Sequence, residues 1–217
     1  MCYIRLMAYR TKYLTRAKIA SRALSFVPFL RMAGLNGSMV RGEDTKRSDI
    51  DFLIVAKLGR LYTVRFFATV FVAMTGWRRH GKMIAGRICL NCFLVDKKLD
   101  ITPRDPKSKK KVAWAYKYMI PLAQEGRIAE RFSEANRWFE KYNVPGQKYS
   151  EKLQDDVFRF YPLRRKKRIE QFLSGRFGDW FERRLMNFQV KRILAGKGAG
   201  DETVATKLEI RLHPKKI

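Results

Sequence analysis

The sequence has few cysteines, few acidic residues and no long apolar run. Its 217 residues include three cysteines, an odd and sparse set that argues against a disulfide-stabilised scaffold and favours a reducing, cytoplasmic compartment. The longest uncharged apolar stretch, Phe66–Trp77, is about eight residues shorter than the roughly 20 that a membrane-spanning helix needs. Residues 1–10 lack the apolar core of a secretory signal, so we expect none.

Zinc and redox sites also have little support in the sequence. It contains two histidines, and Cys89 and Cys92 form a single C-x-x-C pair with no second pair beside it. Both cysteines fall in an apolar run that is typical of a strand, in which residues three apart point to opposite faces. We therefore interpret them as two buried thiols.

Positive charge is the most prominent feature of the composition. Lys and Arg number 47 and Asp and Glu 20, which gives a net charge of +27, and the excess is split evenly between residues 1–100 and 101–217. A content of 46% apolar and 13% aromatic residues is too high for a disordered basic tail. A folded surface this cationic should attract polyanions: RNA or DNA, nucleotide phosphates or the face of an anionic membrane.

Hydrophobic periodicity predicts alternating helices and strands, followed by a mainly α-helical C-terminal part. We expect helices over residues 11–27 and 61–74 and strands over 29–35, 49–55 and 87–95. The polar residues 101–111 predict a linker, so we expect an α/β domain over 1–105 and a basic helical region over 106–217. In that region the pattern predicts helices over 112–124 and 127–142, a long helix or a helix pair over 164–195, and a partial edge strand over 204–212.

One segment combines a glycine turn with a pair of acidic residues. Asp49 and Asp51 lie two apart at the head of an expected strand, so their side chains leave the same face. Two adjacent carboxylates repel each other, and a divalent cation with oxygen ligands relieves that repulsion. The Gly37-Ser38 turn allows close backbone approach and offers a hydroxyl and N–H groups to a phosphate. Metal and phosphate together indicate phosphoryl or nucleotidyl transfer.

The same segment, GSMVRGEDTKRSDIDFLIV, resembles the signature of the polymerase-β-like nucleotidyltransferase superfamily, in its small bacterial and archaeal branch. The residues that match are Gly37, Ser38, Arg41, Gly42, Ser48, Asp49 and Asp51. The order of the surrounding elements extends the similarity to residues 29–95. The resemblance implies an α+β fold, with a mixed sheet core flanked by helices.

The resemblance also implies a function and a set of site residues. It implies metal-dependent transfer of a nucleotidyl group from a nucleoside triphosphate to an unidentified hydroxyl acceptor. Gly37 and Ser38 would bind the triphosphate, with Arg41 adding charge nearby. Asp49 and Asp51 would be the catalytic carboxylates and would hold Mg²⁺, with Mn²⁺ as the alternative ion.

The chain departs from that family at the third carboxylate, which usually lies on a neighbouring strand and assists the attacking hydroxyl. Here the expected strand holds Asn91, while the nearest acids, Asp96 and Asp100, follow it. An amide offers an oxygen to a metal but accepts no proton as a base. Either another group supplies that role, or the chemistry is slow, or the site only binds nucleotide. Asn91 is thus a substitute at the third position or a buried amide satisfied by backbone.

Two other functions remain open for the basic regions. A catalytically degenerate fold could act as a nucleic-acid-binding module, gripping RNA or DNA through basic runs and stacking aromatics. The runs are Lys109–Lys111 and Arg164–Arg168, and the aromatics are Trp138, Phe160, Tyr161 and Trp180. Alternatively, residues 164–195 could contact an anionic membrane through their apolar stripe. Packing of that stripe onto the core is the interpretation we favour.

Overall fold

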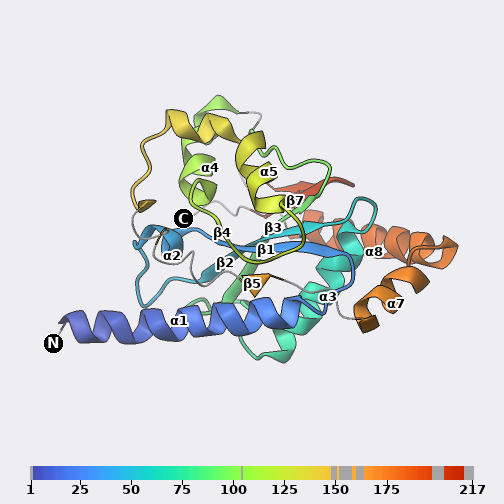
Figure 1. The fold of residues 1–217 in the computed structure, drawn as a ribbon, viewed down its shortest axis with the longest axis horizontal. Helices are drawn as coiled ribbons and strands as arrows, with labels where there is room; N and C mark the ends of the chain where they lie inside the picture. Colours follow the sequence, from blue (N-terminus) through green and yellow to red (C-terminus); the bar gives the residue numbers. More distant parts are fainter. Residues whose placement is uncertain are drawn as a thin grey trace.

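The computed structural model describes residues 2–103, 105–147, 151, 158–159, 164–196 and 203–212. Its centre is a mixed seven-stranded sheet in the order β5-β4-β1-β2-β3-β7-β6 (Figure 1). The strands are β1 (Leu30–Asn36), β2 (Ile50–Ala56), β3 (Ile88–Val95), β4 (Ile120–Gln124), β5 (Phe158–Arg159), β6 (Val204–Ala205) and β7 (Glu209–Arg211). The α+β fold, with its sheet flanked by helices and a helical C-terminal part, is confirmed.

Helices cover both faces of the sheet, and each face has its own core (Figure 1). α1 (Cys2–Leu24), α3 (Leu61–Met74) and α8 (Arg176–Ala195) lie on one face, where Phe52 and Phe93 are buried. α4 (Lys109–Tyr116) and α5 (Ile128–Ala135) lie on the other, above Leu53 and Leu94. The remaining helices are α2 (Ser38–Arg41), α7 (Arg164–Phe172) and two 3-10 segments, Pro106–Ser108 and Arg137–Lys141. Alternating side chains of the central strands supply both cores, which explains their continuous apolar sequence.

The pairing of the central strands brings three functional positions to one end of the sheet. β2 runs antiparallel to β1 and parallel to β3. In this register Asp51 lies opposite Asn36 on one side and opposite Cys89 on the other. The C-terminal end of β1 therefore meets the starts of β2 and β3, and α2 begins directly after β1.

Several predicted elements agree with the structure. α3 has the predicted bounds, and β1, β2 and β3 each lie within about one residue of prediction. The residues predicted as one long helix or a helix pair form the pair α7 and α8, with Gly175 between them. Phe160 and Tyr161 lie outside the described residues.

The helix predicted over residues 112–124 is wrong in its second half. α4 ends at Tyr116, and residues 120–124 form strand β4 beside β1. Pro121 cannot occupy a helix interior, but it fits here because β4 pairs with β1 across a register shift. Long-range pairing with β1 therefore overrides the local helical spacing.

The linker predicted over residues 101–111 is also wrong. Ile101 is buried, and its backbone N–H donates to the side chain of Asn136. A 3-10 turn and the start of α4 occupy residues 106–111. The sheet takes β4, β5, β6 and β7 from beyond residue 105, so both expected segments build the same sheet. The division at residue 105 stays a prediction.

A β-bulge corrects the expected orientation of the two strand cysteines. Leu90 pairs with Phe52 and Cys92 with Leu53, so Asn91 is an extra residue in β3. Because Asp51 and Leu53 point to the same face, their partners Cys89 and Cys92 do so too, contrary to the expectation for an ideal strand. Both face α4, but Cys92 is buried whereas Cys89 reaches a cavity.

Candidate functional site

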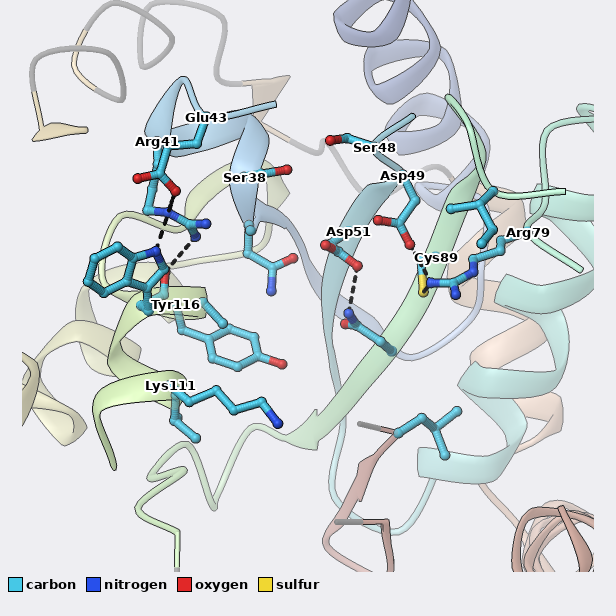
Figure 2. Close-up of a pocket in the computed structure, with 18 of the residues that line it drawn as sticks. Ser38, Arg41, Glu43, Ser48, Asp49, Asp51, Arg79, Cys89, Lys111 and Tyr116 are labelled. Atoms are coloured by element: carbon cyan, nitrogen blue, oxygen red, sulfur yellow. Dashed lines mark hydrogen bonds and ion pairs between the residues drawn. The ribbon is translucent and has the colours of Figure 1, made fainter. Parts of the chain in front are cut away.

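A cavity of about 1110 Å³ lies between the starts of β2 and β3 and the helices α2 and α4. Figure 2 shows Asp49, Asp51 and Cys89 on one side of it and Lys111 and Tyr116 on the other. Its described lining holds three acidic and six basic residues: Glu43, Asp49, Asp51, Arg41, Arg47, Arg79, Lys107, Lys110 and Lys111. The cavity thus combines an acidic corner with a cationic surround, in a volume above the usual range for a single small ligand.

The acidic corner contains three ligand atoms close together. One oxygen of Asp49, one of Asp51 and the sulfur of Cys89 lie within 4.8 Å of one another. The two carboxylates therefore converge, as their spacing predicts, and the parallel register adds the thiol. Asp49, Asp51 and Cys89 can together hold a metal ion.

Gly37 lies directly against this corner. Its φ of 77° is in the left-handed region, and a Cβ on it would meet Asp51 Oδ2 at 2.6 Å. The backbone N–H of Gly37 donates to the Ala115 carbonyl at 3.0 Å, so it is engaged by the end of α4. Ser38 begins α2 on the cavity wall, and its hydroxyl bonds to no residue that the structure describes. The predicted close approach of backbone and carboxylate is thus present, while the phosphate role of Gly37 and Ser38 stays a prediction.

Arg79 already brings a positive charge to the acidic corner. Its Nη1 atom donates to Asp49 Oδ2 at 2.5 Å and to Cys89 Sγ at 3.6 Å. Burial alone would lower the pKa of Arg79, but Cys89 and Asp49 together raise it. Burial likewise raises the pKa of the Cys89 thiol well above its ordinary value, and the charges of Asp51 and Asp49 raise it further. Without a metal, the sulfur is therefore a neutral thiol at physiological pH.

Asn91, the extra residue of the bulge, lies at the acidic corner. Its Nδ2 donates to Asp51 Oδ1 at 2.7 Å. Its Oδ1 is buried and has no hydrogen-bond partner among the described residues, and the same holds for Oδ1 of Asn36, on the other side of Asp51. The expected third position is thus occupied by an amide in direct contact with a site carboxylate.

The acids that follow β3 lie elsewhere. Asp96 accepts the Leu58 backbone N–H at 3.0 Å, and Val95 pairs with Ala56, at the opposite end of β2 from Asp51. Asp100 accepts from Thr102. Neither acid lines the cavity, so neither supplies a third carboxylate to the Asp49–Asp51 pair.

Arg41 is engaged within the protein. Its Nε pairs with Glu43 at 2.8 Å, and its Nη1 donates to the Trp114 carbonyl at 2.6 Å. The bond to the Trp114 carbonyl ties α2 to α4 beside the cavity (Figure 2). The predicted contact of Arg41 with phosphate stays a prediction, and Lys107, Lys110 and Lys111 form the larger cationic wall.

α1 anchors the loop that leads to the acidic corner. Arg10 pairs with the buried Asp44 at 3.0 Å, and the Tyr13 hydroxyl donates to the Lys46 carbonyl at 2.7 Å. Arg16 donates to the carbonyl of Gly86, whose own N–H bonds to Ser48. These bonds hold in place the residues that lead to Asp49.

Sequence reasoning missed Cys89 and Arg79. The strand register places Cys89 beside Asp51, and that register was not predictable from a C-x-x-C spacing. Arg79 comes from the basic connection between α3 and β3, whose sequence carries no sign of which carboxylate it would meet.

A second surface carries exposed aromatic residues on the C-terminal helices. Phe172, Phe177, Trp180 and Phe188 are all exposed, and Trp180 is 47% exposed beneath the guanidinium of Arg184. We expected the apolar stripe of residues 164–195 to pack onto the core. Leu173 and Leu185 do so. Within the described residues, no helix combines the length and apolar character needed to cross a bilayer.

Comparison with known proteins adds no assignment. No family model, no curated protein and no solved structure matches this chain.

Proposed function

We propose that the protein is a cytoplasmic, metal-dependent nucleotidyltransferase that transfers a nucleotidyl group from a nucleoside triphosphate to a hydroxyl acceptor. The proposal uses Mg²⁺, with Mn²⁺ as the alternative ion. The observation that carries it is the arrangement of one cavity, in which an acidic corner that can hold a metal faces a wall of lysines. A metal-bound triphosphate needs these two surfaces at once, one for the cation and one for the phosphate oxygens.

In this proposal each group has a separate task. Asp49 and Asp51 hold the ion, whose chemistry when bound is to neutralise charge on the phosphates. Lys110 and Lys111 bind the phosphate oxygens that face away from the carboxylates. The Ser38 hydroxyl donates to a phosphate oxygen from the start of α2. The acceptor oxygen attacks the α-phosphorus, the bond to the β-phosphate breaks, and pyrophosphate leaves.

The proton of the acceptor hydroxyl has no carboxylate assigned to it. Asn91 occupies the third position and cannot accept a proton. In our proposal, water in the cavity takes the proton, and Asn91 orients Asp51 through its Nδ2 hydrogen bond. We therefore expect turnover slower than that of a site with three carboxylates.

The test is release of pyrophosphate, or labelling of an acceptor, with each of the four nucleoside triphosphates and either Mg²⁺ or Mn²⁺. Asp49→Asn and Asp51→Asn should abolish the signal because each removes a metal ligand. Asp96→Asn is the matched control, since it changes an acid that directly follows β3 and lies outside the cavity. Equal activity in the wild type and both site variants would remove the proposal.

A second candidate function is nucleic-acid binding by a site that has lost catalysis. The Arg79–Asp49 ion pair and the amide of Asn91 favour it, because both depart from an open three-carboxylate site. RNA or DNA would then bind along Lys107, Lys110 and Lys111. Binding of a random oligonucleotide should weaken steeply as salt rises, and replacing these three lysines by glutamine should reduce the slope by about 3. Salt-insensitive binding would exclude this candidate.

A further inference from the structure

We infer that Cys89 is a third protein ligand of the ion held by Asp49 and Asp51, and that the site prefers a divalent cation that accepts sulfur, such as Zn²⁺ or Cd²⁺, over Mg²⁺. This inference rests on the proposed function in that it concerns the same metal position. It differs from the Mg²⁺ expectation because thiolate is a poor ligand for a hard cation and a good one for softer ions.

The geometry supports a shared ion. The Cys89 sulfur and the two carboxylate oxygens lie within 4.8 Å of one another, and metal–sulfur and metal–oxygen bonds are about 2.3 Å and 2.1 Å long. Ligand atoms of a tetrahedral ion with these bond lengths lie about 3.6 Å apart, so side-chain shifts of about 1 Å bring the three atoms onto one ion. The parallel register of β2 and β3 fixes this proximity, since Asp51 and Cys89 are paired residues.

An independent observation points to a cation at the same place. Asn36 is 2% exposed and lines the cavity, and it lies opposite Asp51 in the antiparallel register. Its Oδ1 is buried with no hydrogen-bond partner among the described residues. A buried amide oxygen beside a carboxylate, both of them acceptors, is costly unless a positive charge or a donor completes the site. Asn91 Oδ1 repeats this arrangement on the β3 side of Asp51.

Arg79 shows that this corner already attracts a cation. Its Nη1 touches both Asp49 and Cys89, two of the three ligands. A divalent ion offers twice the charge of the guanidinium to the same groups. As the ion binds, Arg79 leaves Asp49 and the thiol proton of Cys89 passes to solvent while the metal–sulfur bond forms.

Other roles for Cys89 fit the structure less well. As a nucleophile it would need thiolate character without a metal, but burial and two carboxylates oppose this charge. As half of a disulfide it would need Cys92, which is fully buried and hydrogen-bonded with Tyr116. Both cysteines are free thiols.

The experiment is a titration of the full-length chain with Cd²⁺ and, separately, Co²⁺, followed by the thiolate-to-metal charge-transfer absorption. Cys2 is replaced by serine throughout, so that Cys89 and Cys92 are the remaining thiols. We expect the band to saturate at one ion per chain in this background and in Cys92→Ala, and to be absent in Cys89→Ala and Cys89→Ser. Competition by Mg²⁺ and Mn²⁺ then ranks the ions, with Mn²⁺ displacing Cd²⁺ at lower concentration than Mg²⁺.

The size of the loss in Cd²⁺ affinity distinguishes a residue that binds the ion from one that only lies beside it. Loss of the sulfur should weaken Cd²⁺ binding by at least about 100-fold, because removing even an outer-shell partner costs about 10–100-fold. Mg²⁺ affinity should stay nearly unchanged, since a hard cation gains little from thiolate. Thermal unfolding without metal checks that each variant is folded. Because two different variants are used, a folding defect in one does not decide the result.

The outcomes also separate this inference from the proposed function. Binding of Cd²⁺ with no charge-transfer band, abolished by Asp51→Asn but unaffected by Cys89→Ala, would overturn the role of Cys89 while leaving the metal site of the transferase intact. A band that depends on Cys89 in a protein that transfers no nucleotide would keep the ligand assignment and remove the activity. Absence of binding by any of the four ions would overturn the inference.

Discussion

Replacing Arg79 with methionine should tighten metal binding, although it removes a favourable interaction of the folded protein. In the metal-free protein the Arg79 guanidinium forms an ion pair with Asp49, with 2.5 Å between Nη1 and Oδ2. An ion that binds Asp49 must first break this pair and then lies beside a displaced positive charge. Methionine keeps most of the apolar volume of the side chain and removes the charge, so the ion no longer has a competitor.

The size of the effect follows from the exposure of the pair. The side chain of Arg79 is 33% exposed and that of Asp49 is 18% exposed, so the pair is neither fully solvated nor fully buried. Exposed pairs contribute about 0–1 kcal/mol, and hydrogen bonds to charged groups in less solvated sites contribute about 1.5–3 kcal/mol. A value of about 1.4 kcal/mol lies between them and corresponds to a tenfold change in affinity. We therefore expect Arg79→Met to lower the Mn²⁺ dissociation constant by about tenfold.

Calorimetric titration with Mn²⁺ in the absence of nucleotide measures this change. Arg87→Met is the matched control, because Arg87 lies in the same connection but donates to the Gly76 carbonyl and does not line the cavity. Arg79→Met should also unfold at a lower temperature than wild type when no metal is present, since the Arg79–Asp49 ion pair is lost. An unchanged or weaker Mn²⁺ affinity in Arg79→Met would refute the idea that the guanidinium occupies the metal position.

Three further predictions concern the turn, a buried phenol and the aromatic surface. Gly37→Ala should weaken Mn²⁺ binding at least tenfold in a calorimetric titration, because the added Cβ would displace Asp51. Gly76→Ala is the control, since Gly76 also has a left-handed φ but a Cβ added there would meet no atom within 4 Å. Burial raises the pKa of Tyr62 to about 12, so the unfolded chain releases this proton first and the free energy of unfolding should fall as pH rises from about 10 to 12. Urea unfolding should show this slope in wild type, and a slope of equal size in Tyr62→Phe would contradict it. The aromatic surface should bind anionic lipid, so the protein should float with phosphatidylserine vesicles and Trp180→Ala should reduce flotation; equal flotation of both, or binding to RNA alone, would exclude this role.

The central elements were predictable because their signals are local. α3 carries a continuous apolar period of helical length, and β2 is a short apolar run with acids at its head. The spacing of Asp49 and Asp51 gives the two side chains a common face because the apolar run after them predicts extended backbone. The convergence of the two carboxylates therefore follows from the local pattern Asp49-Ile50-Asp51 at the head of a strand, and it was predicted.

The missed features depend on contacts between distant segments. β4 was assigned to a helix because its pairing with β1, about 90 residues earlier, has no local signature. The bulge at Asn91 shifts the side-chain alternation of β3 by one position, so an ideal strand gave the wrong face for one cysteine. Arg79 and Asp49, which form an ion pair, are 30 residues apart in the sequence. None of these could be derived from periodicity, which reports only burial along one element.

Arg79 and Asn91 act on different steps of the proposed reaction, and this separates the two candidate functions. The Arg79–Asp49 pair opposes entry of the ion, so it affects affinity. The amide at position 91 affects removal of the acceptor proton, which matters only after metal and nucleotide have bound. If the protein is a slow transferase, Asn91→Asp should raise the rate at saturating metal, whereas Arg79→Met should act mainly at limiting metal. In a pure binding module neither change would produce pyrophosphate, but Arg79→Met would still tighten Mn²⁺ binding. Measuring both variants at low and high Mn²⁺ therefore distinguishes a site that is slow from one that only binds.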